Sequence, residues 1–419
     1  MRRLLLALSV AAVLLLGVVA AVVIHRLQGE GNIRGSSTEE FTLSSAAPKP
    51  TPPLGRPWPQ YGFDETRDRS VSLALRPPYR RTWAFGAGSL VEFPPSIGYG
   101  RLYFSTNSGK FAAVNLKTGK RAWKYLSHRC VAASPAVGQY KHGTVYAVFL
   151  NKPPCNAAHP HGNGKVIAFA AGFGEIRWQK TIGPSESSPL LIGNRLYVAD
   201  WDGRVWALDA RTGRTIWKRR PARAAIKGAV SSTAGKLYVG SYDGHVYCLG
   251  AQKGRLIWKA KAQRRLYGRS RFYSTPALAY GRLYVGSTDG KVYSYGATTG
   301  RLLWSHGTGG YVYASPAVWN QEVLVGSYSK KFFAFNAATG AELWHFKANG
   351  PISGSAVVVG NVVYFATLGK KKQGRTYALN ARTGKQLWSY PDGKYTPAVA
   401  EKGRLYLIGY ARIYGMVPQ

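Results

Sequence analysis

Short runs of alternating apolar and polar residues recur along most of the chain and predict β-strands. Residues 187–220, "SSPLLIGNRLYVADWDGRVWALDARTGRTIWKRR", show the pattern once in full. The four runs lie at 188–192, 195–199, 204–208 and 214–219. Gly, Asp and Asn separate them, and alternation with period two between such residues is typical of antiparallel strands joined by tight turns. The stretch therefore predicts one four-stranded antiparallel sheet.

This unit repeats at intervals of about 40 residues, which is the period of a propeller blade. A Gly followed four residues later by a Trp marks the last turn and the start of the fourth strand. The pairs are Gly119/Trp123, Gly174/Trp178, Gly213/Trp217, Gly254/Trp258, Gly300/Trp304, Gly340/Trp344 and Gly384/Trp388. Trp83 is in phase but lacks the Gly. Because one blade cannot bury its faces alone, the repeat must continue until a ring closes, with each Trp filling the wedge between neighbouring blades.

The two ends of the repeat region predict how the ring closes. Residues 395–419 contain three strands and no Trp strand, and "RRTWAFG" (80–86) supplies the missing fourth. We therefore expect an all-β, eight-bladed β-propeller of four-stranded antiparallel blades, monomeric and closed by an N-terminal strand. A seven-bladed ring is the alternative if Trp83 lies elsewhere.

The N-terminal residues predict a membrane anchor. Leu4–Ile24 is a run of 21 uncharged residues, about 31 Å long as a helix, which matches a bilayer core of about 30 Å. Arg2 and Arg3 place the N-terminus in the cytoplasm and the propeller outside it. We expect a transmembrane signal-anchor helix (1–26), a flexible Ser/Pro-rich tether (27–55) and the propeller (56–419). The alternative is a cleaved signal peptide with Val18-x-Ala20 at the cleavage site, which would give a secreted protein.

The charge of the chain is strongly positive: 57 Lys and Arg against 18 Asp and Glu give a net charge of +39. Such a charge attracts polyanions, namely nucleic acid, anionic lipid or anionic wall polymer. A location outside the cytoplasm leaves the envelope polymers and lipids, and we do not expect nucleic acid. In each blade, the turn between the first and second strands and the turn between the third and fourth strands lie on the same side of the ring. We call this side the basic face. Its cations include Lys117, Lys120, Arg211, Arg214, Lys253, Arg255, Arg301, Arg382, Lys385, Arg101, Arg195, Lys236, Arg282 and Arg404. We expect the tether to emerge on this face and the cations to face an anionic surface.

Three cysteines are present, Cys130, Cys155 and Cys248. In an oxidising compartment Cys130 and Cys155 could form a disulfide. His128, His142, His159 and His161 lie nearby in sequence, but their spacing matches no metal motif, and we expect no metal.

The repeat also carries a family resemblance. The pattern Ala-x-(Asp/Asn)-x-x-Thr-Gly-x-x-x-Trp stands at Ala207–Trp217, Ala334–Trp344 and Ala378–Trp388, and "WPQYGFDETR" (58–67) precedes the first blade. Over residues 56–419 this resembles the PQQ-like repeat of quinoprotein-type β-propellers. That family includes quinone-dependent dehydrogenases and non-catalytic outer-membrane assembly-factor lipoproteins. The dehydrogenases typically have adjacent cysteines, a calcium ion held by carboxylates and amides, and a catalytic Asp. This chain has no adjacent cysteines, and it lacks the anchoring Cys of the lipoproteins.

The loops on the other side of the ring, which we call the funnel face, are longer and carry aromatic and basic residues. Such a composition is typical of binding surfaces. The candidate binding residues are Arg264, Arg265, Tyr267, Arg269, Arg271, Phe272, Tyr273, Tyr311, Tyr313, Arg223, Lys227, Lys394 and Tyr395. We expect a binding or scaffold module for a protein or an anionic envelope partner, with no cofactor and no catalytic residue. The alternative is a dehydrogenase that holds pyrroloquinoline quinone (PQQ) and calcium in a cationic funnel.

Overall fold

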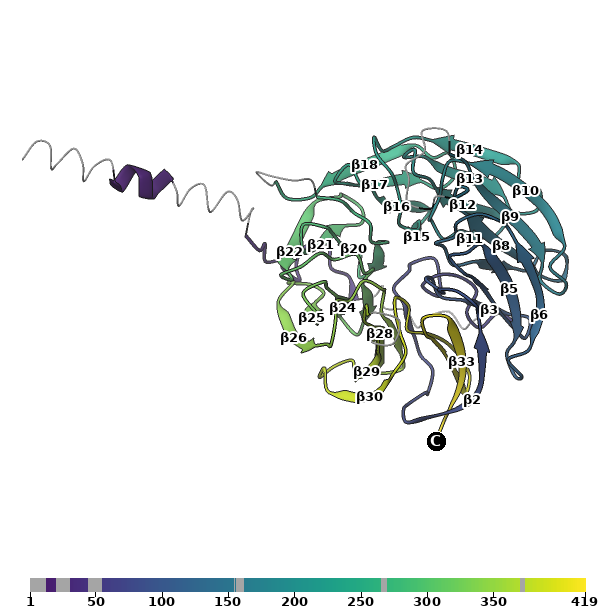
Figure 1. Cartoon of the computed structure of the whole chain (residues 1–419). Helices are drawn as coiled ribbons and strands as arrows, with labels where there is room; N and C mark the ends of the chain where they lie inside the picture. The colour runs from purple at the N-terminus through teal and green to yellow at the C-terminus, as the bar shows by residue number, and fades with distance from the viewer. Residues whose placement is uncertain are drawn as a thin grey trace, which may run out of the picture.

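The computed structural model describes residues 13–19, 31–43, 55–153, 155, 162–264, 270–369 and 374–419. Within these residues the strands form eight sheets arranged as a ring, each with four antiparallel strands, and together they make an eight-bladed propeller (Figure 1). The predicted all-β, eight-bladed propeller of four-stranded antiparallel blades is confirmed. The seven-bladed alternative is wrong because the sheet that contains Trp83 is a blade of its own.

Each blade runs from an inner first strand to an outer fourth strand. Blade 1 consists of β3 (Ser96–Gly98), β4 (Arg101–Ser105), β5 (Lys110–Asn115) and β6 (Arg121–Leu126), and blade 2 of β7 (Ala136–Gly138), β8 (Thr144–Phe149), β9 (Gly164–Ala170) and β10 (Ile176–Ile182), with the short helix η2 (Tyr140–His142) after β7. Blade 3 consists of β11 (Leu190–Ile192), β12 (Arg195–Ala199), β13 (Val205–Asp209) and β14 (Thr215–Arg219), and blade 4 of β15 (Ser231–Thr233), β16 (Lys236–Gly240), β17 (His245–Gly250) and β18 (Leu256–Lys261). Blade 5 consists of β19 (Ala277–Ala279), β20 (Arg282–Gly286), β21 (Lys291–Gly296) and β22 (Leu302–Gly307), and blade 6 of β23 (Ala317–Trp319), β24 (Glu322–Gly326), β25 (Lys331–Asn336) and β26 (Glu342–Lys347). Blade 7 consists of β27 (Val357–Val359), β28 (Val362–Ala366), β29 (Thr376–Asn380) and β30 (Gln386–Tyr390), and blade 8 of β31 (Ala398–Glu401), β32 (Arg404–Ile408), β33 (Arg412–Pro418) and β2 (Tyr79–Gly86).

The ring closes through the N-terminal strand. Strand β2 pairs antiparallel with β33, from Tyr79 opposite Pro418 to Gly86 opposite Arg412, and so forms the outer strand of blade 8. The predicted closure by residues 80–86 is therefore confirmed. Figure 1 shows the purple-blue β2 beside the yellow β33.

The repeated Gly and Trp pack between neighbouring blades. The Trp217 indole Nε1 donates a hydrogen bond to the Ala251 carbonyl of the next blade, 3.1 Å away. Gly254 of that blade lies on the Trp217 ring with φ +67°, where a Cβ would approach ring carbon Cε3 to 2.7 Å. The same contact joins Trp83 to Gly119, Trp123 to Gly174, Trp178 to Gly213, Trp258 to Gly300, Trp304 to Gly340 and Trp344 to Gly384. Trp388 instead meets Tyr79 of β2 edge-on, with ring centroids 5.6 Å apart.

The segment that precedes β2 lines the inside of the ring. Residues 58–71 pass from blade to blade and hydrogen-bond to the first strand of blades 1 to 7 in turn. The contacts join Trp58 to Ile97, Pro59 to Val137, Gln60 to Leu191, Glu65 to Ser232, Thr66 to Leu278, Asp68 to Val318 and Arg69 to Val358. Ser70 and Val71 form β1 (Ser70–Val71), which pairs parallel with β27. This segment occupies the centre of the ring beneath the funnel face.

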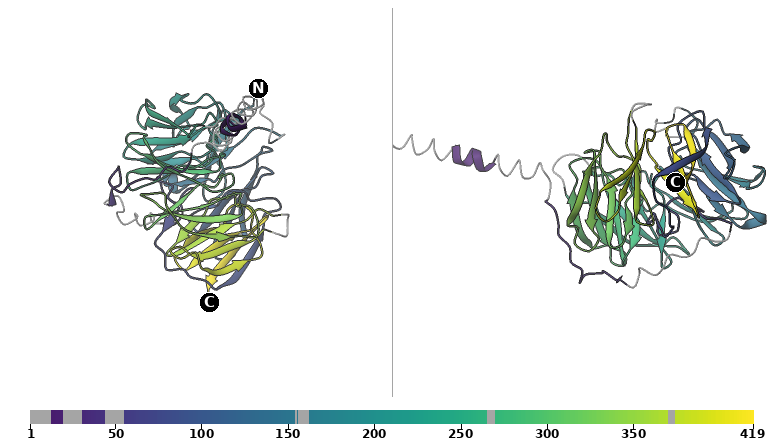
Figure 2. Two further views of the ribbon diagram at one scale, coloured as in Figure 1. Left: turned by 90° about the vertical axis from the view of Figure 1, so that its left-hand side faces the viewer. Right: turned by 90° about the horizontal axis from the view of Figure 1, so that it is seen from below.

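Residues 31–43, which the sequence assigns to the tether, lie along the outside of blades 5 and 6 (Figure 2, right). At the funnel-face end the Asn32 side chain accepts a hydrogen bond from Gly307 N, and at the basic-face end Thr42 N donates to Tyr280 O. The buried Arg282 guanidinium donates to the carbonyls of Ser36, Glu39 and Glu40. The chain enters the ring on the basic face, as expected, but Gly31 lies at the funnel-face end.

Of the predicted anchor, only residues 13–19 belong to the described part of the chain, and they are helical. The described residues include no helix with the length and apolar character needed to cross a membrane.

Candidate functional site

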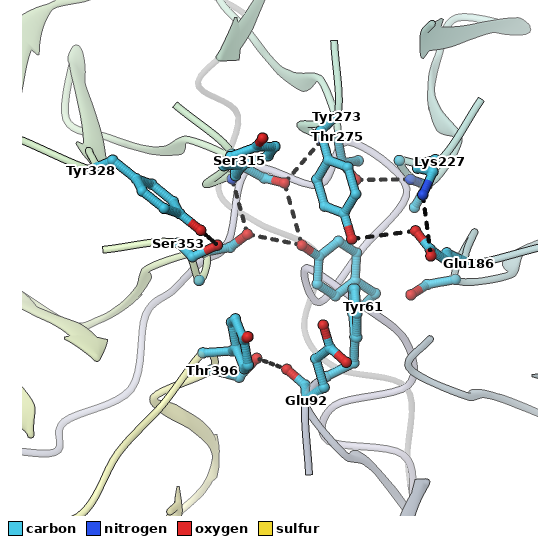
Figure 3. A pocket seen from close by; sticks show the side chains of 18 residues that line it. Tyr61, Glu92, Glu186, Lys227, Tyr273, Thr275, Ser315, Tyr328, Ser353 and Thr396 are labelled. Carbon is cyan, nitrogen blue, oxygen red and sulfur yellow. Dashed lines mark hydrogen bonds and ion pairs between the residues drawn. The ribbon is translucent and has the colours of Figure 1, made fainter. Parts of the chain in front are cut away.

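A cavity of about 230 Å³ opens on the funnel face above the central segment (Figure 3). It is lined by residues that precede the inner strands of several blades, by Tyr328 from the turn between β24 and β25, and by Tyr61 from the central segment. The lining residues are Tyr61, Glu92, Phe93, Glu186, Ser188, Lys227, Gly228, Ala229, Tyr273, Thr275, Tyr313, Ser315, Tyr328, Ser353, Gly354, Ser355, Tyr395 and Thr396. The cavity is rich in hydroxyl groups and aromatic rings and includes two carboxyl groups and one ammonium group.

Hydroxyl groups at the start of the inner strands join the blades around the cavity. Ser355 Oγ accepts a hydrogen bond from Ser315 N at 3.0 Å, and Ser315 Oγ accepts one from Thr275 N at 2.9 Å. Thr275 Oγ1 in turn accepts from Ala229 N at 2.8 Å. These bonds recur because a Ser or Thr comes just before the first strand in most blades. They fix the cavity wall.

Tyr61 forms the floor of the cavity. Its hydroxyl hydrogen-bonds with Ser355 Oγ at 2.9 Å and Ser315 Oγ at 3.3 Å (Figure 3). The Arg69 guanidinium lies over its ring, 4.5 Å from the centroid, which is the distance of a cation–π contact. Burial raises the pKa of the Tyr61 hydroxyl, but Arg69 and the two serine hydroxyls outweigh this and hold the pKa below its usual value.

Two buried arginines support this floor. Arg67 donates to the carbonyls of Val230, Pro189 and Tyr61, and Arg69 to those of Arg67 and Pro316. Burial, and then the neighbouring Arg69, lower the pKa of Arg67 to about 9. Since neither guanidinium reaches the cavity past Tyr61, both act as structural supports of the inner ring.

The charged groups of the cavity differ in their partners. Glu186 forms an ion pair with Lys227 at 3.5 Å and accepts a hydrogen bond from the Tyr273 hydroxyl at 3.4 Å. Burial raises the pKa of Glu186, and Lys227 opposes the rise. Burial also raises the pKa of Glu92 to about 7, with a further contribution from Glu186. Burial and the charges of Glu186 and Glu92 raise the pKa of Tyr273, so its hydroxyl stays protonated.

The structure places four of the predicted binding residues in the cavity wall: Lys227, Tyr273, Tyr313 and Tyr395. Phe272 was predicted at the mouth but is fully buried between blades 4 and 5, because its ring packs edge-on to Tyr293. The remaining described residues lie outside the cavity; they are Arg223, Arg264, Arg271, Tyr311 and Lys394. Arg265, Tyr267 and Arg269 lie outside the described residues.

Sequence reasoning missed the two glutamates and Tyr61. Glu92 and Glu186 both line the cavity, although neither is among the predicted binding residues. The signal that could have found Glu186 is its position in "PSESSP" (184–189), immediately before a first strand. The serines and threonines before the other first strands carry the same signal.

Cys130 and Cys155 are joined by a disulfide, and Cys248 is buried. The described residues contain no group of three His, Cys, Asp or Glu side chains that could hold a metal ion. On the basic face most of the turn cations are exposed, but Arg101, Arg195, Lys236 and Arg404 are half-buried. Arg282 is buried, and residues 36–40 cover it.

The fold and the repeat define a class of protein, the eight-bladed propellers built from PQQ-like repeats. BamB from Moraxella catarrhalis superposes with a TM-score of 0.62 over 81% of this chain and 98% of that chain, at 19% identity. A quinohemoprotein alcohol dehydrogenase from Comamonas testosteroni superposes with a TM-score of 0.70 over 89% and 81%, at 15% identity. At these identities the likeness shows the fold alone.

The chain belongs to the family described as outer membrane protein assembly factor BamB, which it matches over residues 80–185, 137–234, 202–312 and 306–409. The factor of that name from Shewanella oneidensis is 26% identical over 157 residues, 33% of this chain and 35% of the relative. The one from Bordetella pertussis is 27% identical over 177 residues, 40% and 42%. A polyvinylalcohol dehydrogenase from Sphingopyxis sp. is 25% identical over 224 residues, 45% and 32%. The chain thus spans less than half the length of these relatives.

Proposed function

We propose that this protein is a non-catalytic propeller scaffold that binds a protein partner through its funnel face, outside the cytoplasm. The observation that carries the proposal is the cavity on that face, with its aromatic rim and rigid floor. Several relatives are named as assembly factors of the outer membrane, which supports a role in binding other proteins.

Aromatic side chains form the rim. Tyr311 is 54% exposed, and its ring meets Tyr313 edge-on at 6.0 Å; Tyr313 in turn meets Tyr328 at 5.2 Å. Tyrosines supply large, rigid contact areas and are enriched at protein interfaces. Arg271 stacks near Tyr242, 5.4 Å from the ring centroid, and adds a cation beside this rim. The rim therefore has the composition of a protein-binding surface.

The strap of residues 31–43 relates this surface to the N-terminus. Gly31 lies at the funnel-face end, where its carbonyl accepts hydrogen bonds from Gln263 Nε2 and Lys291 Nζ at 3.1 Å each. We propose that the uncharged run Leu4–Ile24 anchors the chain in the membrane. The funnel mouth then lies on the side of the propeller nearest the anchor, where it can meet other envelope proteins.

The cavity fits PQQ poorly, which weighs against the dehydrogenase alternative. PQQ carries three carboxylates, and the charged residues of the cavity are Glu92, Glu186 and Lys227. Lys227 already pairs with Glu186, so no described lining cation is left to balance the quinone. The similarity to the polyvinylalcohol dehydrogenase and to the quinohemoprotein alcohol dehydrogenase is the observation that favours this alternative. A PQQ titration with calcium that saturates in the micromolar range would favour it.

An anionic envelope polymer is the second partner class, and the exposed turn cations of the basic face favour it. Each could contribute about 1 kcal/mol near a strongly anionic surface, and less at physiological salt. Binding to anionic vesicles that persists at physiological salt would support this role.

Site-specific photocrosslinking in intact cells tests the proposed function. A photoreactive amino acid replaces Tyr311 on the funnel face or, as the matched control, Phe173, which is 80% exposed in a turn of the basic face. We expect a discrete protein adduct from position 311 and none from position 173. The same adducts from both positions, or none from 311, would remove the funnel face as the binding surface.

A further inference from the structure

Glu92 differs from the other charged groups of the cavity. Its carboxyl group points into the cavity, toward Tyr61 (Figure 3). Glu92 takes part in none of the ion pairs between described residues, whereas Glu186 forms an ion pair with Lys227. A buried carboxyl group without an ion pair of its own is costly to ionise. The charge of Lys227 opposes the rise in the Glu92 pKa, but burial and Glu186 outweigh it. A cationic ligand beside Glu92 would remove this cost.

The rings around the cavity suit such a cation. Tyr273, Tyr313 and Tyr328 form a continuous wall, with centroids 5.4 Å and 5.2 Å apart. Tyr61 and Tyr395 line the same cavity. Tyrosine rings attract cations through their faces, and cages of this composition bind ammonium groups.

The molecule already binds one ammonium in this way. Lys227 Nζ lies 4.1 Å from the Trp201 ring and 5.4 Å from the Tyr242 ring, with the Glu186 carboxylate as its counter-ion. The space beside Glu92 offers the same combination, a carboxyl group and aromatic rings. An anionic ligand would instead face two carboxyl groups, and Lys227, the one ammonium among the described lining residues, is already paired with Glu186.

We propose that the cavity binds a protonated primary amine, with Glu92 as its counter-ion and the tyrosine rings as its walls. The amine is a lysine side chain of the partner or a free small amine. The inference rests on the proposed function insofar as a partner supplies the lysine. Because the chain carries a net charge of +39, its remaining surface repels small cations, so saturable amine binding reports on this cavity.

Calorimetric titration of the full-length protein tests the proposal with three probes. Nα-acetyl-lysine amide presents the ammonium on a peptide unit, propylamine presents it alone, and Nα,Nε-diacetyl-lysine amide lacks the charge. We expect saturable binding of the first and none of the third. Propylamine that binds about tenfold more weakly than the lysine amide would indicate a partner lysine, and equal binding would indicate a free amine.

Two variants locate the site. Glu92→Gln removes the counter-ion at nearly constant size and should weaken binding about tenfold or more, since it removes a charge-assisted contact. Glu175→Gln changes an exposed glutamate on the basic face and should leave binding unchanged. If the wild-type protein binds the lysine amide and its diacetylated form equally well, the proposal is wrong. Wild-type affinity in Glu92→Gln overturns it as well. A discrete adduct from Tyr311 together with no amine binding would leave the scaffold function standing and remove only this inference.

Discussion

Replacing the Gly of one repeat tests how neighbouring blades are held together. Gly213 has φ +73°, and a Cβ there would lie 2.6 Å from Cε3 of Trp178 in the preceding blade. Gly235 has φ +72°, but a Cβ there would meet nothing within 4 Å. The two positions therefore share the backbone conformation and differ in the contact with the tryptophan ring.

The structure gives different costs for the two alanine variants. An alanine with positive φ costs roughly 1–2 kcal/mol of folding free energy at either position. At Gly213 the methyl group must also displace the packed indole, and overpacking of this kind costs about 1–3 kcal/mol more. Effects of the substitution on the unfolded chain are the same at both positions and cancel in the comparison.

Urea unfolding followed by circular dichroism measures the difference. We expect Gly213→Ala to lower the free energy of unfolding by about 1–3 kcal/mol more than Gly235→Ala, with an unchanged dependence on urea. Equal midpoints for the two variants would refute the reasoning, because the tryptophan contact would then contribute nothing.

Three further predictions concern the strap, the disulfide and the cavity. Arg282→Gln should release residues 31–43 from blades 5 and 6, and limited proteolysis should then cleave these residues faster. The control Arg301→Gln removes only an exposed ion pair with Glu39 and should have little effect on this cleavage. Cys130→Ser should lower the free energy of unfolding by about 3 kcal/mol, measured in urea, because the disulfide closes a loop with a sequence separation of 25; no change would show that the loop is held by other contacts. Binding of lysine amide should strengthen from pH 6 to pH 8, because the pKa of Glu92 is about 7 and its charged form increases over this range, and the rise should be absent in Glu92→Gln. The charged and titratable groups that line the cavity with Glu92 are Tyr61, Glu186, Lys227, Tyr273, Tyr313, Tyr328 and Tyr395.

The fold could be predicted from the sequence because each blade repeats the same local rules. Three features recur blade after blade: alternation of period two, a Gly with positive φ and a Trp four residues after it. A strand that is unclear in one blade can therefore be assigned from the same position in the other blades. The closure of blade 8 by the strand of Trp83 could be predicted from the phase of the repeat and from the missing fourth strand in residues 395–419. The path of residues 31–43 could not be predicted, since it depends on which carbonyls meet Arg282 in the folded structure.

The candidate site was predicted only in part. Tyr273 and Tyr313 were found because aromatic loops on one face are visible in the sequence. Phe272 was misplaced because adjacent loop residues point in opposite directions, and the sequence does not say which of them points inward. Tyr61 was missed for another reason, since its position depends on the path of the central segment along the first strands of blades 1 to 7.

Hydrogen–deuterium exchange of the full-length protein, alone and with the protein captured from position 311, tests the central claim most directly. The account predicts slower exchange in the funnel-face segments 308–313, 326–330 and 394–396. It predicts no change in the basic-face turns 117–120, 172–175 and 211–214. Protection of those turns, with unchanged exchange around the cavity, would contradict the claim that the funnel face is the binding surface.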